Sequence, residues 1–111
     1  MDLYNELQKL CTKLDVEVRA VRKTGSEYAR AYANYRIALA KELLKLKAEG
    51  YSISLAGDVA RGKEDIAELK FLEISKEAIY KANLEAINAT KLKIKIISAQ
   101  IDRELGSSDN S

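Results

Sequence analysis

The chain has 111 residues, of which 47% are apolar and 32% are charged, and its 19 basic and 17 acidic side chains leave a net charge of +2. This composition is typical of one folded domain, and the near-neutral balance excludes a strong overall attraction to nucleic acid or to anionic membranes. Because histidine is absent and Cys11 is the only cysteine, the common zinc sites, catalytic triads, Cys-His pairs and an intramolecular disulfide are excluded, and we expect no metal, cofactor or enzymatic activity.

Residues 2–49 are predicted to form one long helix. Apolar residues recur every three or four positions from Leu3 onward, which is the α-helical period, and this predicted seam includes Val18 and Tyr32. Gly50 fits the left-handed residue that often closes a helix.

Residues 50–62 are predicted to form an ordered connection, because residues 51–62 combine two glycines with alternating apolar residues. Asp58 and Lys63 are both candidate starts for the helix that follows. Acidic residues at positions 64, 65 and 68 suit the first turns of that helix, where the helix dipole favours negative charge.

A second long helix is predicted over residues 63–105, with a seam that includes Leu72 and Ile79. Residues 90–97 alternate between polar and apolar, as a strand does, but they lie within about forty residues without glycine or proline, so helix is preferred there. The polar tail, residues 106–111, is predicted to be disordered.

These elements predict an all-α fold: a long antiparallel two-helix hairpin, similar to a coiled coil, that forms a single domain over residues 1–105. Such a hairpin buries one apolar stripe per helix, but each helix carries a second one. The second stripes consist of Ile37, Ala40 and Leu44 in the first helix and Phe71, Ile74, Ala78, Ala82, Leu92, Ile96 and Ala99 in the second. We therefore expect a homo-oligomeric helical bundle, as a dimer or larger, whether each hairpin closes within one chain or exchanges helices with its neighbour.

The tyrosines of the first helix raise the question of a binding site. If residue 49 meets residue 63 across the connection, Tyr28 faces Asn83 or Leu84, Tyr32 faces Tyr80, and Tyr35 faces Lys76. The members of this tyrosine belt are Tyr28, Tyr32, Tyr35, Lys76, Tyr80 and Asn83. The belt is either a hydrogen-bonded layer that fixes the helix register or a ligand pocket in which Arg30 and Arg36 hold a phosphate.

Two groups of basic residues are further candidates. The same pairing gathers Arg19, Arg22, Lys23, Lys91, Lys93 and Lys95 into one basic band, which is either a nucleic-acid surface or a solvated face. Arg61, Gly62 and Lys63 stand at a helix start, where free backbone N–H groups favour an anion. This anion turn lacks the spacing of a P-loop.

Three segments resemble small helical proteins encoded in early or recombination gene regions of phages and prophages of Gram-positive bacteria. They are Tyr35–Gly50, Ala60–Gly62 and Ala78–Glu104, and the last segment, which ends KLKIKIISAQIDRE, is the most specific. Where the family pattern often ends Arg-Glu-Trp, Leu105 follows Glu104 here. The resemblance implies a phage setting in a bacterial host cell, without implying a mechanism.

We therefore expect a non-enzymatic phage protein that acts as a helical oligomer on a host or phage protein, in DNA metabolism or in evading host defence. The alternatives are a binder of a nucleotide or other small anionic ligand, and a weak nucleic-acid-binding accessory protein. Because no apolar run approaches the length of a membrane span and no signal segment opens the chain, a cytoplasmic location without membrane contact is expected.

Overall fold

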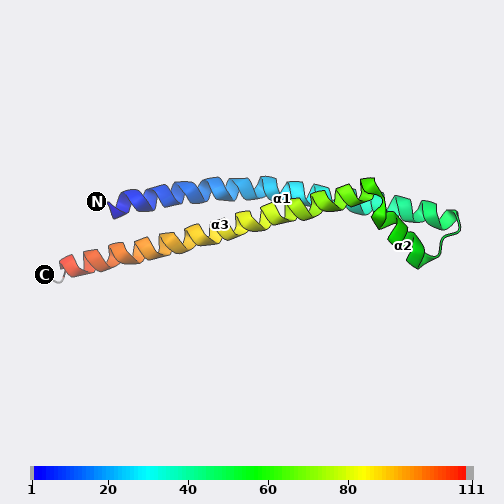
Figure 1. The fold of residues 1–111 in the computed structure, drawn as a ribbon. Helices are drawn as coiled ribbons and strands as arrows, with labels where there is room; N and C mark the ends of the chain where they lie inside the picture. Colours follow the sequence, from blue (N-terminus) through cyan, green and yellow to red (C-terminus); the bar gives the residue numbers. More distant parts are fainter. Residues whose placement is uncertain (1, 110–111) are drawn as a thin grey trace. The chain divides into compact units, whose positions relative to one another are not determined.

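The computed structural model describes residues 2–109, with only the backbone described for residues 107–109. Three helices follow one another along the chain: α1 (Leu3–Ala48), α2 (Ile53–Gly62) and α3 (Glu64–Asp109) (Figure 1). The predicted all-helical fold is confirmed, since the described residues contain no strand and residues 90–97 lie within α3. Over the same residues, no helix has a stretch long and apolar enough to cross a membrane.

The chain divides into two units. Unit 1 comprises the two ends of the chain, up to Lys23 and from Lys81 onward, and unit 2 comprises Thr24–Tyr80. Both α1 and α3 contribute to each unit, whereas α2 belongs to unit 2 alone.

In unit 2 the segment that was predicted to be a connection contains the short helix α2. It starts after Ser52, whose hydroxyl accepts a hydrogen bond of 3.3 Å from the backbone N–H of Leu55 and so caps the helix. The second long helix, for which Asp58 and Lys63 were the candidate starts, begins at Glu64, directly after Lys63. Gly50, with a φ of 100°, turns the chain back between α1 and α2. The helix was not expected because it is short and its glycines resemble those of a loop.

The apolar core of unit 2 lies between α1 and α2. Ala56 and Ala60 are fully buried against Leu46, and three partly buried side chains complete the cluster: Leu39, Leu43 and Val59. Small residues four positions apart on α2 allow its backbone to approach α1 closely, and so they decide where α3 begins.

The start of α3 lies opposite Glu42 instead of Glu49, as the ion pair between Lys63 and Glu42 shows. The expected pairing of residues 49 and 63 is therefore wrong by seven positions, or about 10 Å at 1.5 Å per residue. The cause is α2, which runs back along α1 before α3 begins.

The seam residues of α3 also differ from the prediction. Glu73 is only 7% exposed and Tyr80 is half-buried, whereas Leu72 and Ile79, which were expected in the seam, are 41% and 50% exposed. On α1, Val18 and Tyr32 are likewise exposed. The inward positions follow a strict alternation of three and four residues, the heptad period of a coiled coil, whereas the prediction shifted the seam toward the nearest apolar side chain.

In unit 1, residues from α1 and α3 again run antiparallel, since Leu10 lies beside Ile96 and Ile97 while Glu17 lies beside Asn83. The start of α1 and the end of α3 consequently lie at the same end of this unit (Figure 1). The helix α3 continues to Asp109, so residues 106–109 of the predicted tail are helical. The rest of that tail, residues 110–111, lies outside the described residues.

Candidate functional site

Tyrosines and charged side chains line the seam between α1 and α3 in unit 2. The rings of Tyr28 and Tyr80 stack with their centroids 6.0 Å apart, and the Tyr28 hydroxyl donates a hydrogen bond of 2.7 Å to Glu77 Oε2. This hydrogen bond, together with burial, raises the pKa of Tyr28 to about 12. The Tyr80 ring also lies against Gly25, where a Cβ atom would come within 3.1 Å of it. A glycine in mid-helix thus makes room for the stacked tyrosines.

A second layer of the seam is built from Tyr35, Lys70 and Glu73. The Lys70 ammonium lies 4.8 Å from the centroid of the buried Tyr35 ring and 2.8 Å from Glu73 Oε2. The hydrogen bond to Glu73 raises the pKa of Lys70 above its ordinary value. The ammonium is therefore held by a carboxylate and an aromatic face together, which favours its charged form.

A third layer joins Lys76 and Glu27, whose ammonium and carboxylate lie 3.1 Å apart. Both residues of this ion pair line an open groove of about 360 Å³ between α1 and α3, to which Arg30 also contributes. The groove shares only Arg30 and Lys76 with the ligand pocket that the sequence left open, since neither Arg36 nor a tyrosine lines it, and its lysine already has a carboxylate partner. An anionic ligand there would have to compete with Glu27.

The tyrosine belt is thus only partly assembled as expected. Tyr28, Tyr35, Lys76 and Tyr80 lie in the seam of unit 2, but Tyr28 meets Glu77 and Tyr80, and Tyr35 meets Lys70. The expected pairs are wrong because of the displaced register. Tyr32 is 46% exposed, which places it outside the seam. Asn83 belongs to unit 1, where its side-chain amide donates a hydrogen bond of 3.3 Å to the carbonyl of Glu17.

Three carboxylates of this site, Glu27, Glu73 and Glu77, were missed by the sequence analysis. A strict repeat of seven residues from Ile66 includes Glu73 and Tyr80, and applying it to the sequence would have predicted a polar seam.

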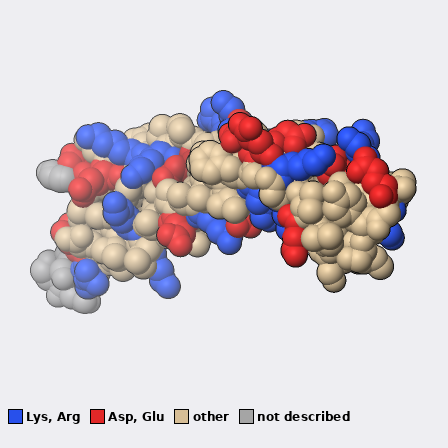
Figure 2. Space-filling view, turned by 45° about the vertical axis from the view of Figure 1, so that its right-hand side comes forward, with Lys and Arg blue, Asp and Glu red and all other residues tan. Residues whose placement is uncertain are grey.

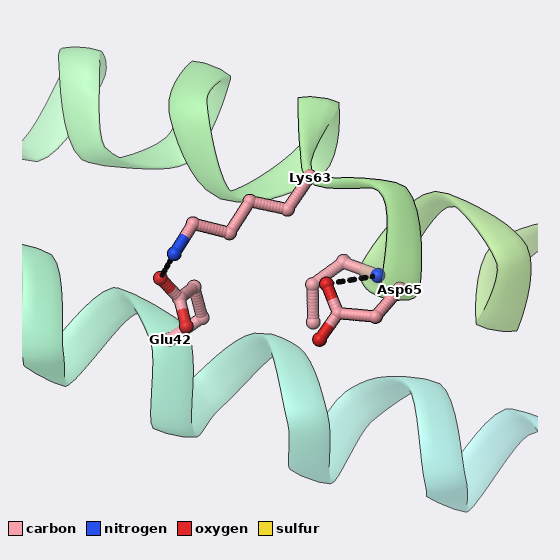
Figure 3. A network of polar contacts seen from close by, with 4 residues as sticks. Glu42, Lys63 and Asp65 are labelled. Carbon is pink, nitrogen blue, oxygen red and sulfur yellow. Dashed lines mark hydrogen bonds and ion pairs between the residues drawn. The ribbon is translucent and has the colours of Figure 1, made fainter.

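The anion turn is occupied by groups of the chain itself. Lys63 directs its ammonium to Glu42, and this hydrogen bond raises the pKa of Lys63 above its ordinary value (Figure 3). Asp65 accepts a hydrogen bond of 3.0 Å from the backbone N–H of Ile66, in the first turn of α3 (Figure 3). An external anion would have to displace both carboxylates.

The other members of the turn give little support to an anion site. Arg61 is exposed and its guanidinium folds back over Gly57, where a Cβ atom would lie 2.9 Å from Nη1. Gly62 ends α2, and Lys63 donates its backbone N–H to the carbonyl of Ala60. Arg61, Gly62 and Lys63 are therefore adjacent in the chain, but the side chains of Arg61 and Lys63 point to different partners and do not converge on one anion.

The basic band is divided. Lys93 lines a groove with Lys9 and Leu10, whereas Arg19 lies nine positions beyond Leu10, about 14 Å further along α1 at 1.5 Å per residue. Lys91 and Lys95 flank Lys93, while Arg22 and Lys23 follow Arg19. The expectation that all six lie side by side is wrong, for the same reason of register.

Among the described residues, no group of three or more cysteine or acidic side chains is arranged to hold a metal ion. Comparison with known proteins found no match, since no family model, curated protein or solved structure is significantly similar to this chain.

Proposed function

We propose that the chain is a non-enzymatic interaction protein that self-associates through the exposed faces of its helices and binds a protein partner. The observation that carries this proposal is the distribution of apolar side chains. Phe71 is 63% exposed on α3 and Leu44 is 70% exposed on α1, while the seam between these helices in unit 2 contains ion pairs and tyrosines. Apolar faces left uncovered in this way are typical of surfaces that bind other proteins.

The outward stripes of both helices support the same proposal. Ile37, Ala40 and Leu44 on α1 are exposed, as are all seven residues of the predicted second stripe of α3: Phe71, Ile74 and Ala78 in unit 2, and Ala82, Leu92, Ile96 and Ala99 in unit 1. Burying such stripes against a second copy gives each helix the two apolar contacts typical of helical bundles.

A separate apolar surface surrounds α2 and suits a partner of another kind. Tyr51, Ile53 and Leu55 are exposed at the start of this helix, and Figure 2 shows an area without charged side chains around it. We assign this surface to a host or phage protein, in DNA metabolism or in evading host defence. The phage setting rests on the resemblance of residues 78–104 to small phage and prophage proteins.

The experiment that tests self-association is multi-angle light scattering at micromolar concentration, with sedimentation velocity as a second measurement. A mass of two or more chains supports the proposal, and a stable monomer contradicts it. Capture from infected or lysogenic cells, with Ile53→Asp as the matched control, then identifies the partner. A protein captured equally well by both versions does not bind at α2.

The second candidate function is binding of a nucleotide or other small anion in the groove beside Arg30 and Lys76. A ligand at 100 times its dissociation constant stabilises a fold by about 2.7 kcal/mol, so a thermal-shift panel of nucleotides detects it. A shift that Arg30→Ala abolishes would favour this candidate, and no shift with any nucleotide would exclude nucleotides as its ligand.

A further inference from the structure

Within unit 2, the outward side of α1 is strongly basic. Its residues 24–48 contain five basic side chains, at positions 30, 36, 41, 45 and 47, and two acidic ones, Glu27 and Glu42. Both acidic side chains face the seam, where Glu27 pairs with Lys76 and Glu42 pairs with Lys63. The basic side chains thus dominate the surface that α1 presents to solvent.

The outward side of α3 in the same unit has the opposite charge. Residues 64–80 contain two basic side chains, Lys70 and Lys76, and five acidic ones, of which Glu73 and Glu77 face the seam and those at positions 64, 65 and 68 are exposed. Both basic side chains are ion-paired in the seam, Lys70 with Glu73 and Lys76 with Glu27. The surface that α3 presents to solvent is therefore acidic.

Each of these charged surfaces has an apolar stripe through it. On α1, Ile37, Ala40 and Leu44 are spaced by three and four residues, with Lys41 and Lys47 one turn from Leu44 on the same side. We call these residues, with Arg36, the basic face. On α3, Phe71, Ile74 and Ala78 have the same spacing, and they follow Glu64 and Glu68 by two turns and one turn. These five residues form the acidic face.

We propose that the basic face of one copy docks on the acidic face of a second copy. The inference rests on the proposed self-association and specifies how it occurs. Two basic faces would oppose like charges across an apolar contact, and so would two acidic faces, whereas one of each brings opposite charges together. Because the interface uses two different surfaces of the chain, it is heterologous and builds either a closed ring or an open chain of hairpins.

A nucleic acid is the other occupant that a basic surface attracts, but it fits this one poorly. Phosphates would contact Arg36, Lys41 and Lys47 and leave Ile37 and Leu44, which lie between them, in water. A helix with its own apolar stripe and acidic flanks would cover the apolar and the basic side chains of this surface at once, and α3 presents such an arrangement in its acidic face.

Complementation between two full-length variants tests the proposal. Leu44→Asp places a charge in the apolar stripe of the basic face and leaves the acidic face intact. Phe71→Asp disrupts the acidic face and leaves the basic face intact. We expect each variant alone to be monomeric by light scattering, and an equimolar mixture to form a heterodimer of twice the monomer mass, since the mixture contains one intact face of each kind. Val16→Asp, at an exposed apolar position of α1 in unit 1, is the matched control and should keep the wild-type mass.

Charge reversal gives an independent arm that does not depend on the apolar substitutions. Lys41→Glu with Lys47→Glu should weaken self-association by about tenfold or more, and adding Glu64→Lys with Glu68→Lys in the same chain should restore most of it. Circular dichroism of every variant checks that the helices are retained, so that a loss of mass is not a loss of fold.

Each outcome has a separate meaning. A monomeric wild-type chain at micromolar concentration overturns self-association and this interface together. A wild-type oligomer whose two Asp variants form no heterodimer, or in which Leu44→Asp still self-associates, overturns the heterologous interface alone. Unchanged mass in all variants, with binding of a DNA duplex lost only after Lys41→Glu and Lys47→Glu, overturns it in favour of nucleic acid.

Discussion

The placement of Glu73 in the seam makes a quantitative prediction about stability. Glu73 is 7% exposed, and its partner Lys70 has a side chain that is 47% exposed. When Glu73 is replaced by Leu, Lys70 can turn toward water, so no buried charge is left without a partner. The lost ion pair contributes little, because one of its members is half in solvent.

The gain comes from burial of apolar carbon. A leucine side chain carries about two more carbon atoms than the methylene stem of glutamate, and burying each is worth about 0.8 kcal/mol. After loss of the ion pair, Glu73→Leu should stabilise the fold by about 1 kcal/mol, which raises Tm by on the order of 4 °C for a chain of this size. Thermal denaturation followed by circular dichroism at one fixed protein concentration measures the change.

Two controls make this measurement specific for the seam. Glu104→Leu makes the same exchange at an exposed position and should change stability by less than about 0.5 kcal/mol. Leu72→Ala, at the neighbouring position that is 41% exposed, should cost about 1 kcal/mol or less, well below the 2–5 kcal/mol of a core leucine. A destabilising Glu73→Leu combined with a Leu72→Ala cost of 2 kcal/mol or more would refute the seam described above.

Three further predictions follow from the other contacts. Leu46→Ala should destabilise the chain by about 3 kcal/mol in chemical denaturation, because Leu46 is 3% exposed in the core formed with α2; a cost below about 1 kcal/mol would mean that α2 is not packed on α1. The pKa of Tyr28 is raised from 10.0 to about 12, so the unfolded chain loses the phenol proton at a lower pH than the folded chain does. The stability that the hydrogen bond to Glu77 provides is therefore complete below pH 10 and is lost between pH 10 and 12. Tyr28→Phe should flatten that part of a plot of Tm against pH, and an unchanged alkaline slope would contradict the hydrogen bond. Because the basic band is divided between the levels of Lys93 and Arg19, no micromolar binding of a DNA duplex is expected at about 150 mM salt in a fluorescence-anisotropy titration, and binding that Lys93→Glu abolishes would reverse this conclusion.

The two long helices could be predicted because their signals are local. The recurrence of apolar residues at three and four positions, and the absence of breakers between residues 63 and 105, place α1 and most of α3 to within a few residues. Residues 90–97 were the difficult case, and the length of the uninterrupted segment outweighed their alternating pattern. Helix ends are less certain, and α3 extends four residues beyond the predicted end.

The pairing of the helices could not be predicted in the same way, because it depends on packing between distant residues. Whether residue 63 meets Glu49 or Glu42 is decided by α2, and α2 exists because Ser52 caps it and Ala56 and Ala60 fit against Leu46. The small residues at positions 56 and 60, four apart on one side, were the available signal. One missed helix of ten residues shifted the predicted pairing of α1 with α3 in unit 2 by one to two turns.

The chemistry of the seam explains why that register is specific even though the seam is a weak source of stability. Lys63 with Glu42, Lys70 with Tyr35, Tyr28 with Glu77 and Lys76 with Glu27 all obey one register, and a slip by one turn would separate every pair. Polar residues at core positions of coiled coils fix alignment at a cost in stability, which apolar burial elsewhere has to offset. In unit 2 this role falls to the apolar core between α1 and α2 and, where they are covered, to the outward faces of α1 and α3. A hairpin aligned by its polar seam and stabilised by what covers its outer faces should therefore unfold more easily as it is diluted, so that its Tm rises with protein concentration.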